Sequence, residues 1–143
     1  MRVLLCGCGS IGQRYIRLLR DLFKEKIHLS AWRTNKYKNE KSDFIDKYNV
    51  EEYYDYDEAL RKDNDVVFVT NPTFLHVRTA RKAVESDTAV FMEKPVGISS
   101  KECLELKKEA EQKKTYIYVG YCMRFHPIIQ RLKKLILDKE LGK

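Results

Sequence analysis

A glycine-rich turn directly after the first apolar segment constrains the fold of this chain more than any other feature. Val3–Cys6 are apolar, and GCGSIG follows at once, so that Gly7, Gly9 and Gly12 have the spacing G-x-G-x-x-G. In a strand–turn–helix unit the first glycine permits a tight turn and the second a close approach of the backbone to a pyrophosphate. The third glycine lets the helix pack against the strand, so the motif predicts a βαβ unit at the start of the chain.

Strand and helix patterns alternate along the rest of the chain. The continuous apolar run Val66–Val69, for example, is typical of a parallel strand buried on both faces. We predict strands at Arg2–Cys6, Ile27–Trp32, Val50–Tyr54, Asp65–Thr70, Thr88–Met92 and Tyr116–Gly120. Helices are predicted at Ile11–Phe23, Ser42–Tyr48, Tyr56–Lys62, Thr73–Ser86, from Ser99 or Ser100 to Lys113, and at Pro127–Lys139. This alternation predicts a single α/β domain with a doubly wound parallel sheet in the order 3-2-1-4-5-6.

Some helix ends and faces can also be predicted. Thr73 is a candidate N-cap, and Ser99 with Glu102 has the spacing of a capping box. The inward face of the first helix is expected to comprise Ile11, Tyr15, Leu18, Leu19 and Leu22.

The start of the first helix is the predicted site of a dinucleotide. Free backbone amides and the helix dipole attract phosphate there. The residues expected to hold the pyrophosphate are Gly7, Gly9, Ser10, Ile11 and Gly12. A glycine turn kept only for packing is the alternative.

The end of the second predicted strand should set the choice of cofactor. An acid there would bind the ribose 2′-hydroxyl of NAD, but the sequence reads AWRTNK, with no acid. Arg33 can instead bind a 2′-phosphate and stack on the adenine, assisted by Thr34 and Lys36. We therefore favour NADP over NAD, the alternative being that Arg33 is only a solvated loop residue.

Charge and cysteine content limit the kinds of partner and ligand that we expect for this chain. The net charge of +7 over 143 residues raises the possibility of nucleic acid, but acids are interleaved with the basic residues, so neither nucleic acid nor a membrane is an expected partner. Four cysteines lack CxxC or metal-ligand spacing with the three histidines, so no metal site is predicted. Unpaired thiols fit a reducing, cytoplasmic setting.

Three further motifs follow successive predicted strands, at the edge where a doubly wound sheet binds ligands. They are TNPT with His76, MEKP around Lys94, and GYCMRFHP, which contains Arg124. Together with the glycine turn, these motifs resemble the Gfo/Idh/MocA oxidoreductase family in register from Arg2 to about Lys143. The Glu-Lys-Pro element is the most distinctive part of the match.

The resemblance implies roles for residues beyond the glycine turn. Thr70, Asn71, Pro72 and His76 would lie along the ribose and nicotinamide of NADP or NAD, and Glu93 would line the nicotinamide pocket. For His76, a purely structural role is an equal alternative.

The resemblance also implies a substrate site. Lys94 is similar to the family's active-site lysine, which holds the substrate oxygen and stabilises its developing negative charge. Unusual peptide geometry is expected between Lys94 and Pro95. Arg124 would border the substrate pocket, the alternative being a salt bridge at a helix entry.

The chain departs from the family in its length. Members carry a second domain that completes the substrate pocket and provides a catalytic histidine, and none of the three histidines here can take that role. We expect residues 1–123 to form the NAD(P)-binding domain and residues 124–143 a crossover helix leading to an absent substrate domain. Alone, the chain should bind cofactor and turn over little or nothing.

These observations lead to one main hypothesis. The chain would be the cofactor-binding part of an oxidoreductase that moves a hydride to or from a sugar-like alcohol or ketone, in a parent that forms a homo-oligomer. A regulatory module that binds NAD(P) without chemistry is the alternative.

Overall fold

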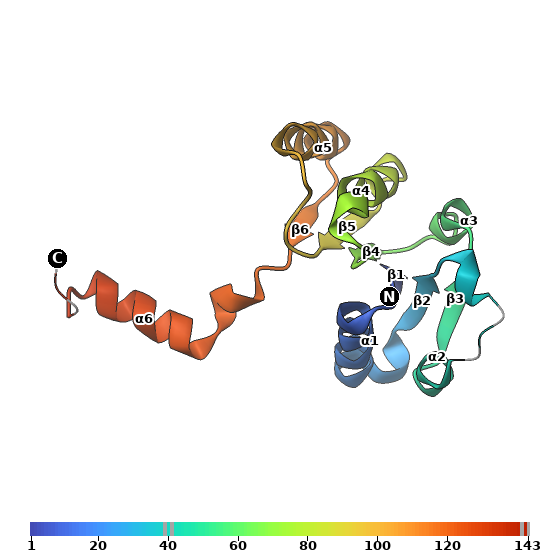
Figure 1. Ribbon diagram of the computed structural model, residues 1–143, viewed down its shortest axis with the longest axis horizontal. Helices are drawn as coiled ribbons and strands as arrows, with labels where there is room; N and C mark the ends of the chain where they lie inside the picture. The colour runs from blue at the N-terminus through green and yellow to red at the C-terminus, as the bar shows by residue number, and fades with distance from the viewer. Residues whose placement is uncertain (39, 41, 141, 143) are drawn as a thin grey trace.

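The computed structural model describes residues 1–38, 40, 42–140 and 142, and its centre is a parallel sheet of six strands (Figure 1). The strands are β1 (Arg2–Cys6), β2 (His28–Trp32), β3 (Val50–Tyr53), β4 (Val66–Val69), β5 (Ala89–Met92) and β6 (Ile117–Val119). Their order is β3-β2-β1-β4-β5-β6, which confirms the predicted doubly wound topology. The order reverses at β1, where Val3 is paired with Leu29 of β2 and with Val66 of β4.

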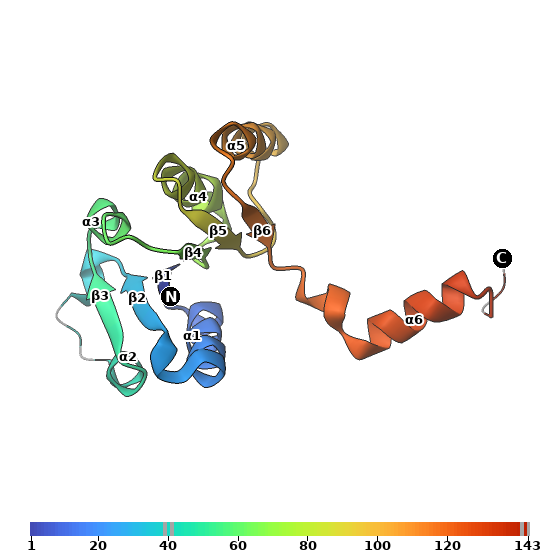
Figure 2. The ribbon, with the colours of Figure 1, turned by 180° about the vertical axis from the view of Figure 1, so that it is seen from behind.

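Helices cover both faces of the sheet. They are α1 (Ser10–Phe23), α2 (Asp43–Lys47), α3 (Tyr56–Leu60), α4 (His76–Glu85), α5 (Ser100–Lys113) and α6 (Pro127–Leu137). Short 3-10 turns lie at Lys24–Lys26, Asn35–Tyr37, Thr73–Leu75 and Cys122–Phe125. Seen from either side, α1 and α2 lie on one face of the sheet, and α3, α4 and α5 lie on the other (Figures 1 and 2).

The alternation of side chains along β1 builds the two halves of the core. Leu4 and Cys6 point to the face covered by α3, α4 and α5, while Val3 and Leu5 point to the face covered by α1 and α2. All four side chains are fully buried, as expected for a central parallel strand. The sheet is therefore a rigid platform whose strand ends fix the loops that follow them.

The inward face of α1 differs from the predicted one. Gly12, Ile16 and Leu19 are buried, whereas Leu18 is 45% exposed and Leu22 is 74% exposed. A helix that lies on a flat sheet buries one narrow stripe, and Ile16 with Leu19 forms that stripe. The prediction that Leu18 and Leu22 face inward was therefore wrong.

One of the two predicted caps is present. The Ser99 hydroxyl accepts a hydrogen bond from the Glu102 amide, 3.3 Å away, and so caps α5. Thr73 does not cap α4, because the chain first makes a 3-10 turn over Thr73–Leu75 and α4 begins at His76. The prediction of a helix starting at Thr73 was therefore wrong by one turn.

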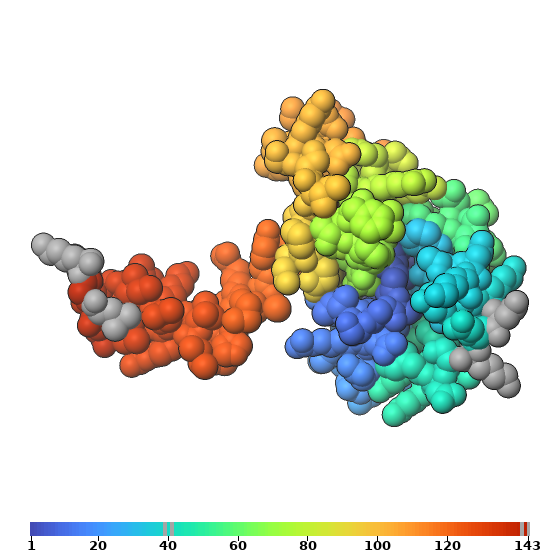
Figure 3. Space-filling model, viewed as in Figure 1, coloured from blue at the N-terminus to red at the C-terminus, as the bar shows by residue number. Residues whose placement is uncertain are grey.

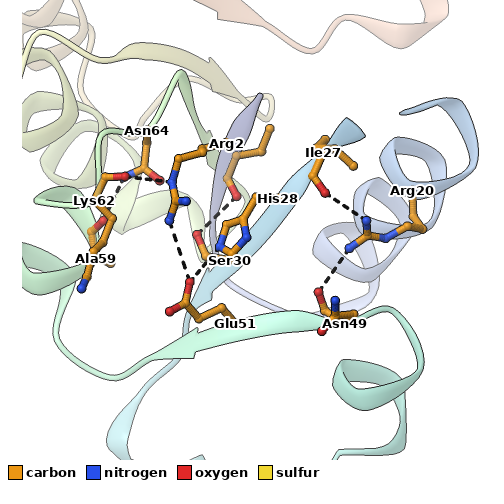
Figure 4. Close-up of polar contacts among 11 residues, drawn as sticks. Arg2, Arg20, Ile27, His28, Ser30, Asn49, Glu51, Ala59, Lys62 and Asn64 are labelled. Carbon is orange, nitrogen blue, oxygen red and sulfur yellow. Dashed lines mark hydrogen bonds and ion pairs between the residues drawn. The ribbon is translucent and has the colours of Figure 1, made fainter. Parts of the chain in front are cut away.

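The end of the sheet that carries the strand N-termini is closed by polar contacts (Figure 4). The Arg20 guanidinium donates to the Ile27 carbonyl at 3.0 Å and to the Asn49 carbonyl at 3.2 Å. Arg2 donates to the Lys62 carbonyl at 2.9 Å. A hollow of about 590 Å³ lies here, but these two guanidinium groups already bind backbone carbonyls, so the hollow is not a ready site for an anion.

The final helix, α6, extends away from the sheet and buries none of its residues (Figures 1 and 3). Apolar side chains are exposed along it, and they are Ile128, Ile129, Leu132, Ile136 and Leu137. Within the described ranges, no helix combines the length and the apolar character needed to cross a membrane.

Candidate functional site

A cleft of about 440 Å³ lies at the carboxyl ends of the strands, on both sides of β1. The residues that line it come from the glycine turn, from the segment after β2 and from the segment after β4. They are Gly7, Cys8, Gly9, Gln13, Trp32, Arg33, Thr34, Tyr37, Glu40, Ser42, Asn71, Pro72 and Leu75. This is the crevice that a doubly wound sheet opens where its strand order reverses.

Close backbone packing explains two of the glycines in the turn. Gly7 has a φ of +107°, which favours glycine, and a Cβ on it would lie 2.9 Å from the Asn71 backbone. A Cβ on Gly12 would overlap the Gly7 carbonyl and lie 3.1 Å from Thr70 Oγ1. Both positions therefore exclude a side chain because the fold itself occupies the space.

Gly9 differs from these two glycines. Its φ of −69° is open to any residue, and a Cβ there would meet nothing within 4 Å. Packing within this chain therefore does not require glycine at this position. Gly9 is also the N-cap of α1 and offers no side chain to the free amides that follow, at Ser10 and Ile11. A ligand phosphate fits both observations, because it needs close backbone approach and free N–H donors.

Thr70 and Asn71, which follow β4, hold the opposite wall of the cleft. The Thr70 hydroxyl lies 2.8 Å from the Gly7 carbonyl and so braces the glycine turn. The Asn71 amide donates to Thr79 Oγ1 at 2.8 Å, while its Oδ1 is buried and has no hydrogen-bond partner among the described residues. An unpaired buried acceptor beside the cleft is consistent with a missing ligand donor.

His76 lies behind this wall and is 2% exposed. Its Nδ1 is 2.8 Å from the Pro95 carbonyl, and its Nε2 is 2.8 Å from the Asn71 carbonyl. The ring thus joins the loop after β4 to the loop after β5. Both nitrogens face backbone carbonyls, a geometry that favours the structural role among the two alternatives for this residue.

Arg33 lines the cleft, and its side chain is paired. Its guanidinium makes an ion pair with Glu52 of β3, and its Cζ lies 5.0 Å from the centre of the Tyr37 ring. Although no acid ends β2, the neighbouring strand therefore supplies one. Thr34 is exposed beside Arg33 on the same rim of the cleft.

The cysteine of the glycine turn is partly enclosed. Burial raises the pKa of the Cys8 thiol to about 11, with the charges of Arg33 and Glu52 lowering and raising it respectively. The thiol is therefore protonated at neutral pH, and a free thiolate is not part of the site's chemistry.

Glu93 is fixed by groups from two directions. Its Oε1 accepts a hydrogen bond from the Tyr15 hydroxyl of α1, and its Oε2 accepts one from the Lys94 amide at 3.1 Å. A Cβ on Gly120, after β6, would come within 3.3 Å of Oε1. The carboxylate is thus held at the meeting point of α1, β5 and β6.

Lys94 and Arg124 lie outside the cleft. Lys94 is exposed, and its ammonium group makes no ion pair within the described part of the chain. The Lys94–Pro95 peptide bond is cis, in agreement with the unusual geometry expected there. Arg124 is exposed on the 3-10 turn before α6, away from the lining residues.

Several residues of the site were not found from the sequence. Tyr15 was assigned only to the packing face of α1, and Glu52 was given no role. For Glu52 a signal existed, because pairing the end of β2 with β3 places Glu52–Tyr53 beside Ala31–Trp32. For Tyr15 none existed, since its contact with Glu93 spans 78 residues. The remaining residues missed are Cys8, Gln13, Trp32, Tyr37, Glu40, Ser42 and Leu75.

Among the described residues, no three His, Cys, Asp or Glu side chains are grouped to hold a metal ion.

Comparison with known proteins identifies this architecture. Residues 1–121 match the Gfo/Idh/MocA model, described as an oxidoreductase family with an NAD-binding Rossmann fold. The chain belongs to this family. The resemblance inferred from the glycine turn and the Glu-Lys-Pro element is thereby confirmed.

Individual relatives match over part of their length. Inositol 2-dehydrogenase of Salmonella typhimurium is 33% identical over 103 residues, which are 68% of this chain and 30% of that protein. The WlbA dehydrogenase of Chromobacterium violaceum, solved with NADH and UDP-GlcNAcA, superposes with a TM-score of 0.86 at 22% identity, over 97% of this chain and 40% of that one. Biliverdin reductase of Synechocystis, solved with biliverdin and NADP+, gives 0.81 at 19% identity, over 94% and 42%. The chain thus spans less than half the length of these relatives.

The residues present fit a nicotinamide dinucleotide. Gly9 and Asn71 line one cleft, and the Asn71 Oδ1 has no hydrogen-bond partner among the described residues. The free amides of α1 follow directly after Gly9, where no atom would contact a Cβ. The family's NAD-binding Rossmann fold therefore has, in this chain, the groups that a dinucleotide requires.

Proposed function

We propose that this chain is the cofactor-binding part of an NAD(P)-dependent oxidoreductase that acts on the alcohol or ketone of a sugar-like substrate. The observation that supports this proposal most directly is at Gly9. The fold leaves room for a side chain there, yet the residue is glycine and it precedes a helix whose first amides are free. Family membership supports the activity, and a relative named for inositol supports a polyhydroxylated substrate.

The cofactor would lie along the cleft with its adenosine end at Arg33 and its nicotinamide end at the loop after β4. Gly7, Gly9, Ser10, Ile11 and Gly12 would receive the pyrophosphate. Arg33 and Thr34 would face the adenosine ribose. Thr70, Asn71 and Pro72 would border the nicotinamide ribose, with His76 holding their loop from behind and Glu93 lining the nicotinamide pocket. Bound there, the nicotinamide supplies hydride transfer.

Cofactor choice rests on Arg33. Its guanidinium lines the cleft, where it can bind a 2′-phosphate, but part of its charge is already compensated by Glu52. We therefore expect both NADP and NAD to bind, with a small preference for NADP.

Lys94 would bind the substrate. Its exposed ammonium follows a fixed strand end and has no competing ion pair among the described residues, so it is free to hold the reacting oxygen and stabilise negative charge on it. Arg124 would border the substrate, and residues 124–143 would lead to the domain that completes the pocket and provides the proton-transferring group.

Fluorescence titration of this chain with NADPH and NADH tests the proposal. We expect both to bind, NADPH somewhat more tightly. If neither cofactor binds at millimolar concentration, the assignment is wrong. In the longer protein, Lys94→Ala should abolish turnover while cofactor affinity is kept. Unchanged turnover in that variant would contradict the role proposed for Lys94.

A further inference from the structure

We propose that Glu52, on β3, sets the balance between NADP and NAD by holding Arg33 in an ion pair. The inference rests on the proposed function, because it presumes that the cleft binds a nicotinamide dinucleotide. Glu52 would act through Arg33 and not by touching the cofactor, so it is a positioning residue for selectivity.

The pair is built into the sheet. Glu52 lies beside Ala31 in the register of β3 with β2, and the Arg33 amide donates to the Tyr53 carbonyl at 2.9 Å. The two side chains meet directly above this anchored backbone, Nη1 of Arg33 against Oε1 of Glu52. The Arg33 side chain is 10% exposed and that of Glu52 is 24% exposed. Partial burial reduces screening by salt, so this pair is stronger than an ordinary surface ion pair.

The two partners face different spaces. Arg33 lines the cleft beside Thr34 and Tyr37, whereas Glu52 is absent from that lining and borders a separate hollow with Lys38 and Tyr54. A cofactor in the cleft therefore reaches the guanidinium and not the carboxylate. The charge of Glu52 is felt at the glycine turn nevertheless, because it shifts the pKa of the Cys8 thiol in the direction opposite to Arg33.

The two cofactors differ only at the 2′-position. The 2′-phosphate of NADP carries negative charge, so it competes with Glu52 for the Arg33 guanidinium. The 2′-hydroxyl of NAD is neutral and takes little part in this competition. Glu52 thus lowers affinity for NADP selectively, and its removal leaves the guanidinium free for the phosphate.

The test is Glu52→Gln, which keeps the size of the side chain and removes its charge. Affinities for NADPH and NADH are measured by fluorescence titration of the 143-residue chain. We expect NADPH to bind about tenfold more tightly and the affinity for NADH to change less than about twofold. Glu51→Gln is the matched control, since the neighbouring Glu51 pairs with His28 outside the cleft, and it should leave both affinities unchanged.

A second set of variants separates selectivity from folding. In an Arg33→Gln background, Glu52→Gln should no longer change the ratio of the two affinities, which a merely structural role would not predict. Glu52→Asp retains charge on a shorter side chain and should give an intermediate ratio even if the Gln variant melts early by circular dichroism.

The outcomes are distinct. If the unaltered chain binds neither cofactor, the proposed function fails and this inference fails with it. Two other results would overturn this inference but leave the proposed function intact. In the first, both cofactors bind, but neither Glu52→Gln nor Glu52→Asp changes the ratio of the two affinities. In the second, Glu52→Gln still changes this ratio in the Arg33→Gln background.

Discussion

The Tyr15 hydroxyl donates a hydrogen bond to Glu93 Oε1 over 2.5 Å and so ties α1 to the loop that follows β5. The Tyr15 ring also meets Phe68 and Phe91 edge-on, with centroids 5.4 and 5.3 Å away. Burial and the neighbouring Glu93 carboxylate both raise the pKa of Tyr15, so the phenol stays protonated and remains the donor. One residue assigned from the sequence only to packing thus fixes a carboxylate of the candidate site.

Removing this hydroxyl should cost stability without altering the packing. Tyr15→Phe keeps both aromatic contacts but leaves Glu93 with one donor fewer, so we expect a loss of about 1.5–3 kcal/mol in the free energy of unfolding. Urea denaturation followed by circular dichroism measures it. Tyr118→Phe is the control, because Tyr118 also contacts Phe91 but is exposed, and the loss from this substitution should stay below about 0.5 kcal/mol. Equal losses in the two variants would contradict the role of the Tyr15 hydroxyl.

Two glycines of the turn should respond differently to alanine. Gly9→Ala meets no neighbouring atom, so the folded chain should lose no more than about 1 kcal/mol, the cost of a poorer N-cap. Its methyl group would nevertheless occupy the space for the pyrophosphate, and NADPH binding should be lost. Gly12→Ala overlaps the Gly7 carbonyl and should lower the melting temperature strongly. Thermal melting and cofactor titration separate the two effects, and undiminished binding by Gly9→Ala would argue against phosphate at this turn.

Alkylation of Cys8 should depend steeply on pH. The thiolate is the reactive form, and burial raises the pKa of Cys8 to about 11. Its thiolate fraction, and with it the rate of labelling by iodoacetamide, should therefore rise about tenfold per pH unit between pH 8 and pH 10. The exposed Cys122 should be labelled first at pH 8. Peptide mapping by mass spectrometry follows each site, and rapid labelling of Cys8 at pH 8 would contradict its burial.

His76 should be required for stability. His76→Phe fills much of the same space but leaves the carbonyls of Asn71 and Pro95 without their ring partner. The ring carries at least one N–H, so at least one of these carbonyls loses its donor, and we expect a loss of about 1–3 kcal/mol in the free energy of unfolding by urea. His126→Phe is the control, since His126 is exposed and its ring only accepts from the Ile128 amide. A loss no larger than the control's would show that the two loops do not depend on His76.

Local pattern was enough for the architecture. The alternation of six predicted strands with helices was sufficient to predict the strand order, because parallel strands joined by helices have few allowed topologies. The positions of Gly7, Arg33 and Asn71 around one cleft followed from the same order, since the carboxyl ends of parallel strands meet at one edge.

Details that depend on packing could not be predicted in this way. Helical periodicity marked Leu18 as a buried position, but a helix on a sheet covers only one stripe, and the placement of α1 determines which.

The sequence by itself determined the order of the strands and the position of the glycine turn between β1 and α1, because these depend on spacing along the chain. Only the tertiary structure decided how the charged groups of the candidate site are paired. Arg33 meets Glu52 and Glu93 meets Tyr15 across 19 and 78 residues, through contacts between elements that no local pattern encodes. The sequence shows which residue types are present, but the pairing of their charged and polar groups depends on the folded sheet.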